Sequence, residues 1–245
     1  MRRLAGALGF LTTIPLQMTE DAWEGFRREP AVMPAVGYLV GALVAIPVVV
    51  SPIPALGGFA LVLAVYVLTG INHFDGLTDL ADGLAVHGSE AERVGAMRDS
   101  ALGVGGLLVG AIVVIGLFAV GQVLTGRGRT AFGVVVAAEV AAKLAMLVVL
   151  VRGTPRHEGL GSALAEFATH RSLAVGGLLA VPAMVLSWPS PASAVALAGG
   201  LLVALVMGWV ARSRLGGISG DVVGATNEVA RLSGLLLGVI AWTLW

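Results

Sequence analysis

The chain has 245 residues, of which 57% are apolar and only 12% are charged. Soluble domains carry about a quarter charged residues, so this composition excludes a soluble globular protein and indicates an integral membrane protein. The 15 basic and 15 acidic residues cancel, which gives no electrostatic reason to expect nucleic acid as a partner. Cysteine is absent, so disulfides, thiol catalysis and cysteine-ligated metals are excluded as well.

The N-terminal residues 1–16 begin with arginines and continue as an apolar stretch. A signal peptide has a similar start, but here Pro15 and a charged stretch follow in place of a small-residue cleavage site. We therefore expect a short buried or interfacial helix that belongs to the mature protein. The polar residues 17–30 after it are too charged to cross a bilayer.

Seven apolar stretches follow and are separated by turns or polar loops. Their lengths are close to the thickness of a bilayer when they are read as helices. They predict an all-α, polytopic membrane protein with about seven transmembrane helices, which forms a single domain over residues 1–245. The expected spans are residues 31–50, 55–72, 101–124, 131–151, 172–188, 192–211 and 230–245.

The arginines are distributed unevenly between the connecting segments. Alternating spans would place the N-terminal segment and the loops 73–100, 152–171 and 212–231 on one side, which carries twelve arginines. The opposite turns carry only Arg127 and Arg129. Basic residues concentrate in cytoplasmic loops, so we predict a multi-pass protein of the cell membrane whose long loops and water-facing chemistry are cytoplasmic.

Residues 72–83 contain the most informative motif, Asn-His-Phe-Asp-Gly-Leu-Thr-Asp-Leu-Ala-Asp-Gly. The spacing of Asp75, Asp79 and Asp82 is i, i+4 and i+7, which places them on one narrow stripe of a helix. Like charges this close repel each other, and a row of carboxylates suits Mg²⁺, Mn²⁺ or Ca²⁺. The alternative is a solvated acidic face, which we disfavour because charge beside lipid is costly.

Three further polar clusters are expected at the same face. Together they supply carboxylates for a metal, arginines for phosphate and glycines for close approach, which favours metal-assisted phosphoryl transfer. No P-loop motif is present, which argues against an NTPase. The clusters are Arg98, Asp99 and Ser100; Arg152, Arg156, His157 and Glu158; and Gly216, Gly217, Asp221, Asn227 and Glu228.

Each of these clusters also has a simpler explanation. Arg98 and Asp99 could form a local ion pair, and His157 could be an ordinary exposed loop residue. Asp221 and Glu228 share a helix face through their i, i+7 spacing. Asp221 could instead cap the last helix, which is a common role for aspartate.

Glu139 and Lys143 lie four residues apart within the fourth expected span. This spacing allows them to neutralise each other inside the helix bundle. Lys143 also lies about two turns below the cytoplasmic end of its span, from where it could reach a substrate phosphate from beneath. Both interpretations are open at the level of sequence.

The order of these motifs resembles one family, cobalamin synthase, the adenosylcobinamide-GDP ribazoletransferase of vitamin B12 assembly. The resemblance extends over nearly the whole chain. The family often has lysine where this chain has Arg98, and it usually has arginine where this chain has Lys143. The motifs that carry the resemblance are G-F-L-T-T-I-P at 9–15, N-H-F-D-G-L-T-D-L-A-D-G at 72–83, R-D-S-A-L-G-V-G at 98–105, P-R-H-E-G-L-G at 155–161 and G-G-I-S-G-D-V-V-G-A-T-N-E at 216–228.

The resemblance implies a Mg²⁺-dependent membrane enzyme that joins α-ribazole, or its 5′-phosphate, to adenosylcobinamide-GDP and releases GMP. The two substrates and the lipid bilayer are then its partners, with a homo-oligomer or other corrinoid-assembly enzymes as further candidates. On this interpretation the metal ligands are Asp75, Asp79, Asp82, Asp221 and Glu228. The catalytic residues are Asp82, Arg98, Asp99 and Lys143, and the substrate-binding residues are His73, Ser100, Arg152, Arg156, Glu158 and Asn227.

Two other functions fit parts of the sequence. CDP-alcohol phosphotransferases are similar in plan, with clustered aspartates at a cytoplasmic membrane face, but their Asp-x-x-Asp-Gly-x-x-Ala-Arg spacing is absent here. A cation transporter would use the aspartates and Glu139 as an ion path. The concentration of acidic residues at one face, with few charges deep in the spans, argues against transport.

Overall fold

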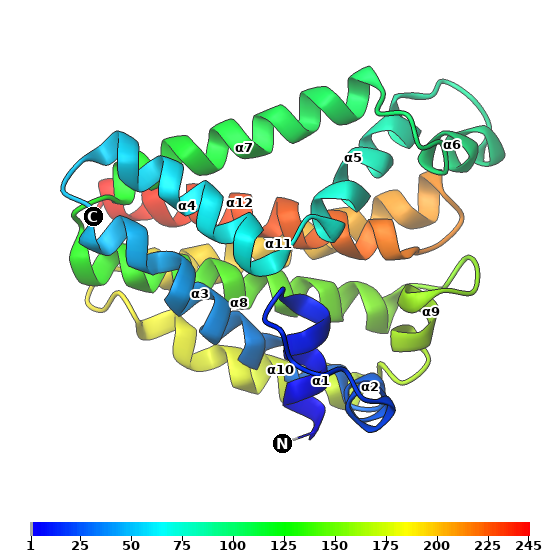
Figure 1. Ribbon diagram of the computed structural model, residues 1–245, viewed down its shortest axis with the longest axis horizontal. Helices are drawn as coiled ribbons and strands as arrows, with labels where there is room; N and C mark the ends of the chain where they lie inside the picture. The colour runs from blue at the N-terminus through cyan, green and yellow to red at the C-terminus, as the bar shows by residue number, and fades with distance from the viewer. Residues whose placement is uncertain (1) are drawn as a thin grey trace.

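Helices make up the regular structure of residues 2–245, which the computed structural model describes (Figure 1). Within this part of the chain, strand-type pairing is limited to one isolated parallel bridge between Pro155 and Ile218. The all-α class predicted from the apolar stretches is therefore confirmed. The expected N-terminal helix is also present as α1 (Arg2–Leu11), which packs against α2 (Glu20–Arg27).

Among the described residues, five helices are long and apolar enough to cross a membrane. A sixth span results if α4 (Pro54–Thr69) and α5 (Asn72–Ala85) are taken together across their 99° bend. The stretch expected as the fifth span is the shorter pair α10 (His170–Ala180) and η2 (Val181–Val185). A polytopic helical membrane protein is confirmed, with five or six spans in place of seven. The long helices are α3 (Met33–Val50, preceded by η1, Pro30–Val32), α7 (Val104–Leu124), α8 (Gly128–Arg152), α11 (Ala192–Arg214) and α12 (Gly220–Thr243).

Helix α8 forms the centre of the bundle. Most of its residues are buried, and it packs against α3, α11 and α12. Its sequence is rich in alanine and valine, and small side chains let neighbouring helices approach closely in membrane proteins. A helix enclosed in this way can hold Glu139 and Lys143 away from lipid.

Helix α12 begins at Gly220, which is ten residues before the expected span boundary at residue 230, because the segment 220–229 is helical. Ser219 is its N-cap, and the Ser219 hydroxyl accepts a hydrogen bond from the backbone N–H of Val222. The expected loop 212–231 is therefore short, and Glu228 and Arg231 lie buried inside the bundle. Arg231 must be removed from the set of arginines assigned to the long loops.

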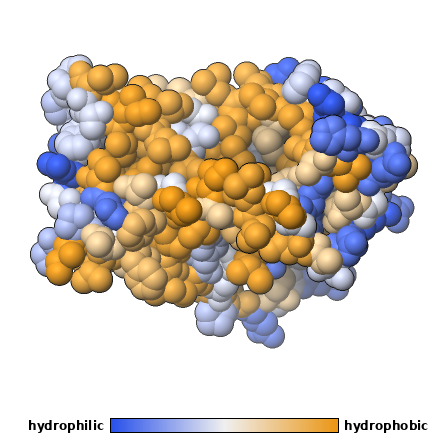
Figure 2. Space-filling model, turned by 90° about the horizontal axis from the view of Figure 1, so that it is seen from above, coloured by the Kyte–Doolittle hydropathy of each residue, from blue (hydrophilic) through white to orange (hydrophobic). Residues whose placement is uncertain are grey.

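Polar residues gather mainly at one end of the molecule. Figure 2 shows apolar side chains over most of the visible face and a dense hydrophilic group at its right end. Figure 1 places α5, α6 (Glu90–Met97) and α9 (Leu160–Ala165) at that end. The motifs singled out in the sequence converge there, with the exceptions described below.

Candidate active site

The aspartate stripe of α5 (Asp75, Asp79 and Asp82) lies beside α12 because the two helices cross closely. Helix α5 packs against α12, and a Cβ atom at Gly76 would lie only 2.8 Å from the Cα atom of Asp221. Position 76 therefore requires glycine if the helices are to keep this distance. The crossing brings Asp221 beside the stripe, so that Asp75, Asp82 and Asp221 all act on the charge of Asp79.

Asp82 has a structural role that the sequence did not reveal. Its two carboxylate oxygens accept hydrogen bonds from the backbone N–H groups of Gly103 and Gly106, each at 2.8 Å. These donors belong to the first turn of α7, whose N-terminal N–H groups have no partner within the helix. Asp82 thus fixes α7 to α5, while the remaining lone pairs of its oxygens stay available to other ligands.

The carboxylates at this end fit a hard cation. Asp75 is exposed and Asp79 is half-buried, so both can be reached from the polar end. No group of three His, Asp or Glu within residues 2–245 forms a ready-made metal site. Mg²⁺ is commonly held by only one or two carboxylates, with water and substrate phosphates completing its shell, and this donor set is compatible with that mode.

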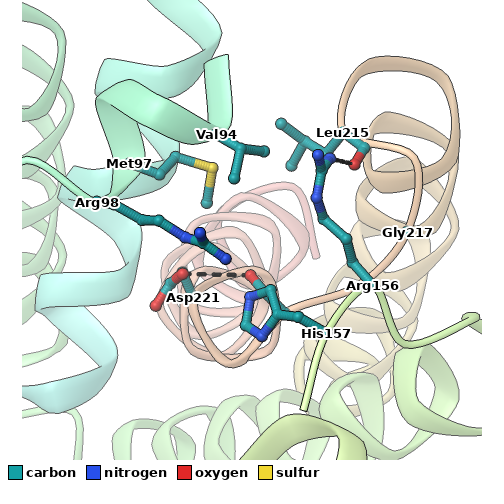
Figure 3. Close-up of a pocket in the computed structure, with 9 residues that line it drawn as sticks. Val94, Met97, Arg98, Arg156, His157, Leu215, Gly217 and Asp221 are labelled. Carbon is teal, nitrogen blue, oxygen red and sulfur yellow. Dashed lines mark hydrogen bonds between the residues drawn. The ribbon is translucent and has the colours of Figure 1, made fainter. Parts of the chain in front are cut away.

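A cleft lined by positive side chains adjoins Asp221 (Figure 3). Arg98 comes from the C-terminal end of α6, and Arg156 and His157 come from the loop after α8. Arg98 and His157 are close enough to attract the Asp221 carboxylate. We call this the basic cleft. Its side chains can donate hydrogen bonds to the anionic oxygens of a phosphate group.

Two loops are joined to shape the basic cleft. The backbone N–H of Arg156 donates to the carbonyl of Ile218 at 3.0 Å, and the N–H of Ile218 donates to the carbonyl of Thr154 at 2.9 Å. Gly217 between them has φ +156°, and a Cβ atom there would lie 2.5 Å from the Thr154 carbonyl oxygen. The Gly216-Gly217 pair in the sequence therefore serves a close backbone approach, as its composition suggested.

The side chain of Arg156 holds a third element in place. Its guanidinium pairs with Glu90 of α6 at 2.8 Å and donates to the backbone carbonyl of Leu215. Helix α6 itself starts with a capping box between Ser89 and Glu92. Arg156 is thus partly engaged in structure, which leaves Arg98 as the freer arginine of the cleft.

Asp221 also lines a second, larger space of about 470 Å³, which we call the apolar cavity. Its polar groups come from Asp221, Asn72 and His73. The rest of the wall is mainly apolar and includes Phe10, Met18, Met146, Leu160, Leu164 and Val223. Asp221 therefore stands where the basic cleft and the apolar cavity meet.

The alternative that Asp221 caps α12 is wrong, because Ser219 fills that position. The Asp221 carboxylate instead accepts a hydrogen bond from the Ser219 hydroxyl at 3.2 Å, as the dashed line in Figure 3 shows. Its position in the first turn of α12 leaves it half-buried and in contact with both spaces.

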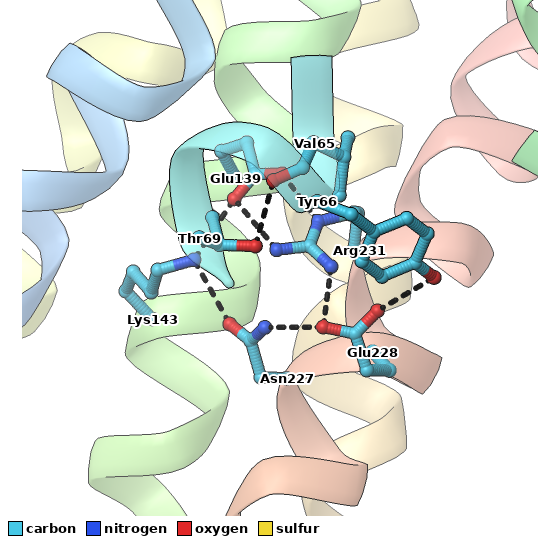
Figure 4. A network of polar contacts seen from close by, with 8 residues as sticks. All are labelled: Val65, Tyr66, Thr69, Glu139, Lys143, Asn227, Glu228 and Arg231. Atoms are coloured by element: carbon cyan, nitrogen blue, oxygen red, sulfur yellow. Dashed lines mark hydrogen bonds and ion pairs between the residues drawn. The ribbon is translucent and has the colours of Figure 1, made fainter. Parts of the chain in front are cut away.

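Three expected site residues lie in a different place, a buried network between α8 and α12 (Figure 4). The Lys143 ammonium donates to Glu139 and to the side-chain oxygen of Asn227, both at 2.9 Å. The Asn227 amide donates to Glu228 at 2.9 Å. Lys143 is fully buried, and its contacts are those of a neutralised pair within the bundle. The alternative expectation, that Lys143 reaches a substrate phosphate, is wrong for this structure because the ammonium lies inside the bundle.

Two residues that were not expected from the sequence, Arg231 and Tyr66, complete the network. Arg231 pairs with Glu139 and, at 2.5 Å, with Glu228. The Tyr66 hydroxyl of α4 donates to Glu228 at 3.3 Å. An ionisable residue within an apolar span is the signal that could have found Arg231.

The expectation that Glu228 shares a metal with the aspartates is also corrected. Glu228 is seven residues after Asp221, which corresponds to about 10 Å along the helix. Glu228 therefore lies in the interior of the bundle, whereas Asp221 lies at its end. Glu228 and Asp221 do lie on one helix with i, i+7 spacing. The Asp221 carboxylate lines the two spaces at the polar end, whereas the Glu228 carboxylate is buried in the network. Of the two acidic residues in the last motif, Asp221 lies at the polar end and Glu228 does not.

The remaining expected residues are exposed or lie apart. Arg152 lines a separate groove with Arg212, between α8 and α11. Asp99 and Ser100 are exposed, and an Asp99 oxygen accepts the backbone N–H of Ala101 at 3.0 Å. Within residues 2–245 no ion pair joins Arg98 to Asp99, so the local-pair alternative is not supported. Glu158, the neighbour of His157 in the chain, is exposed and lines neither the basic cleft nor the groove beside Arg152.

The fold and the site define a class: a polytopic helical membrane protein in which carboxylates and basic side chains meet at one polar end. The family described as Cobalamin-5-phosphate synthase matches residues 3–240. The chain is 49% identical to the adenosylcobinamide-GDP ribazoletransferase of Halorubrum lacusprofundi, with 98% of this chain and 97% of that protein covered. The chain belongs to the cobalamin-5-phosphate synthase family.

Other relatives are similar over most of their length. Identity to the adenosylcobinamide-GDP ribazoletransferase of Haloquadratum walsbyi is 40%, with 98% of each chain covered. Identity to the corresponding protein of Deinococcus radiodurans is 37%, with 96% of this chain and 84% of that protein covered. No solved structure shows a significant match to the chain.

Proposed function

We propose that the chain transfers the adenosylcobinamide phosphate group of adenosylcobinamide-GDP to α-ribazole or its 5′-phosphate and releases GMP. The relatives named above carry this activity in their names. The observation that supports it most directly is the position of Asp221, which lines both the basic cleft and the apolar cavity beside the aspartate stripe. A phosphoanhydride and an amphipathic acceptor can thus meet at one point.

The charges of the site suit the phosphoanhydride. Arg98 and His157 would bind phosphate oxygens in the basic cleft. Asp75, Asp79 and Asp221 would hold Mg²⁺, which supplies neutralisation of the pyrophosphate when bound. The acceptor hydroxyl oxygen forms a bond to the phosphorus that stays on cobinamide, and its proton is released to solvent. The bond from that phosphorus to the GMP oxygen breaks, and GMP leaves with the electron pair.

We further propose that the polar end faces the cytoplasm of the cell. The arginines of the N-terminal segment and of the long loops support this orientation, whereas Arg127 and Arg129 belong to the opposite turn. The buried ion pairs among Glu139, Lys143 and Arg231 give no support to the transporter alternative, because their charges are satisfied within the bundle.

The test uses purified protein in lipid nanodiscs with Mg²⁺, adenosylcobinamide-GDP and α-ribazole. We expect the joined corrinoid and one equivalent of GMP, both measured by mass spectrometry, and no product when EDTA replaces Mg²⁺. Parallel reactions contain CDP-diacylglycerol and an alcohol. Product from this second pair, with none from the first, would replace the proposal by the lipid-synthase alternative.

A further inference from the structure

The apolar cavity has the size of a small-molecule site. Its volume of about 470 Å³ falls within the roughly 300–1,000 Å³ typical of ligand pockets. One nucleoside can fit in such a space. A corrin macrocycle with its amide side chains is much larger, so it would have to remain outside.

The walls of the cavity belong to several elements of the bundle. Phe10 comes from α1, Met146 from α8, Leu164 from α9 and Val223 from α12. Met146 and Leu164 are each only 1% exposed, which makes them part of the packed core. Rigid apolar walls with few polar groups are suited to a flat heterocycle.

One polar group of this wall has no partner. The Nδ1 atom of His73 is buried and makes no hydrogen bond to any of residues 2–245. The ring is confined because a Cβ atom at Gly224 of α12 would already lie 3.1 Å from the Cα atom of His73. A buried polar atom without a partner costs about 1–3 kcal/mol, so His73 is a strained polar position in an otherwise apolar wall.

The position of the cavity indicates how a bound nucleoside would be oriented. Asp221 lies between the cavity and the basic cleft, where the phosphates are proposed to bind. We infer that the apolar cavity binds the heterocyclic base of the acceptor nucleoside, with its sugar toward Asp221, and that the cavity walls select the base. This inference rests on the proposed function and extends it to specificity.

The first experiment changes the size of the cavity. Leu164→Ala enlarges it, and Leu147→Ala is the matched control because Leu147 is equally buried but does not line the cavity. Acceptors are α-ribazole and a riboside whose base carries an additional fused benzene ring. We expect Leu164→Ala to shift the ratio of kcat/KM at least tenfold toward the larger base, with the KM for adenosylcobinamide-GDP unchanged.

The control Leu147→Ala should leave the ratio at the wild-type value. Met18→Ala provides a second enlargement, because Met18 is 42% exposed and its loss should not affect folding. Equal ratios in wild type, Leu164→Ala and Met18→Ala would overturn the inference while leaving the proposed function intact.

A second experiment is independent of turnover. Equilibrium dialysis of α-ribazole against wild type and Val223→Phe, which narrows the cavity, measures binding alone. We expect at least tenfold weaker binding by Val223→Phe and unchanged binding by Leu147→Ala. Binding that is insensitive to Val223→Phe would contradict the cavity assignment, whereas specific binding without GMP release would contradict only the proposed reaction.

Discussion

The carboxylates of Asp82 and Asp79 lie on one helix but are held differently. Asp82 accepts two backbone N–H groups of α7, whereas Asp79 is half-buried among other acidic groups. Loss of charge should therefore have different effects at the two positions. At Asp82 it affects the attachment of α7, and at Asp79 it affects mainly the binding of a cation.

We predict that Asp82→Asn lowers the free energy of unfolding by about 1 kcal/mol, since its amide nitrogen cannot accept from the second N–H group. Asp79→Asn should leave stability within about 0.5 kcal/mol and lower turnover at least about a hundredfold, which corresponds to roughly 2.7 kcal/mol in the transition state. Thermal unfolding and GMP release measured on the same samples separate the effects. A normal rate for Asp79→Asn would remove the metal role from the stripe.

The buried network provides a second prediction for individual residues. Glu139 and Glu228 balance Lys143 and Arg231, so Lys143→Met leaves one negative charge uncompensated in the bundle. Removal of one partner of a buried pair costs about 3–5 kcal/mol. The double variant Glu139→Gln/Lys143→Met restores neutrality, and we expect it to recover more than half of the lost stability.

Denaturant unfolding in detergent measures both variants. A double variant that is less stable than Lys143→Met alone would show that hydrogen-bond geometry, and not charge balance, dominates this network. Turnover of the double variant provides an additional comparison. If Lys143 contacted a substrate phosphate, the double variant would stay inactive even though its buried charges are balanced.

At the level of helices, the crossing of α5 and α12 determines where the aspartates meet. We predict that Gly76→Ala lowers turnover at least tenfold, because a methyl group 2.8 Å from the Cα atom of Asp221 must separate the helices. Gly95→Ala in α6 is the control, since nothing lies within 4 Å of a Cβ atom there. Alanine at that position should be neutral or should stabilise the helix by up to about 1 kcal/mol.

Turnover and thermal unfolding of the two alanine variants are compared in nanodiscs. Equal activity of Gly76→Ala and Gly95→Ala would mean that the site tolerates a displaced Asp221. The helix crossing would then be a packing feature without a direct effect on the reaction.

For the whole molecule, the polar end defines an orientation that labelling can test. Single cysteines at Ser89 and Ser100, both exposed at the polar end, should react with a membrane-impermeant maleimide only from the cytoplasmic side. A cysteine at the exposed Pro52, in the turn between α3 and α4, should react only from outside. The natural chain has no cysteine, so its labelling is zero. Reaction of all three positions from one side would contradict the arrangement of the spans.

Local patterns in the sequence were sufficient for the helical class and for the stripe of α5, because apolar length and i, i+4, i+7 spacing are properties of one segment. The start of α12 was misplaced by ten residues, because polar residues such as Glu228 and Arg231 are typical of loops and their buried partners lie on other helices. The capping role of Asp82 depends on a contact with α7, and no spacing within residues 72–83 encodes it. The apolar cavity likewise requires residues from helices far apart in the chain.

The four charges at the centre of the bundle also bear on how the chain enters the membrane. Glu139 and Lys143 are four residues apart on α8, and Glu228 and Arg231 are three apart on α12. Each helix therefore carries its own neutralising pair and can leave the translocation machinery without an unpaired charge. The contacts from Arg231 to Glu139 and from Lys143 to Asn227 join the two helices, so they require both helices to be present. Insertion and assembly can thus proceed as separate steps, with the late contacts closing the bundle around a core that was already neutral.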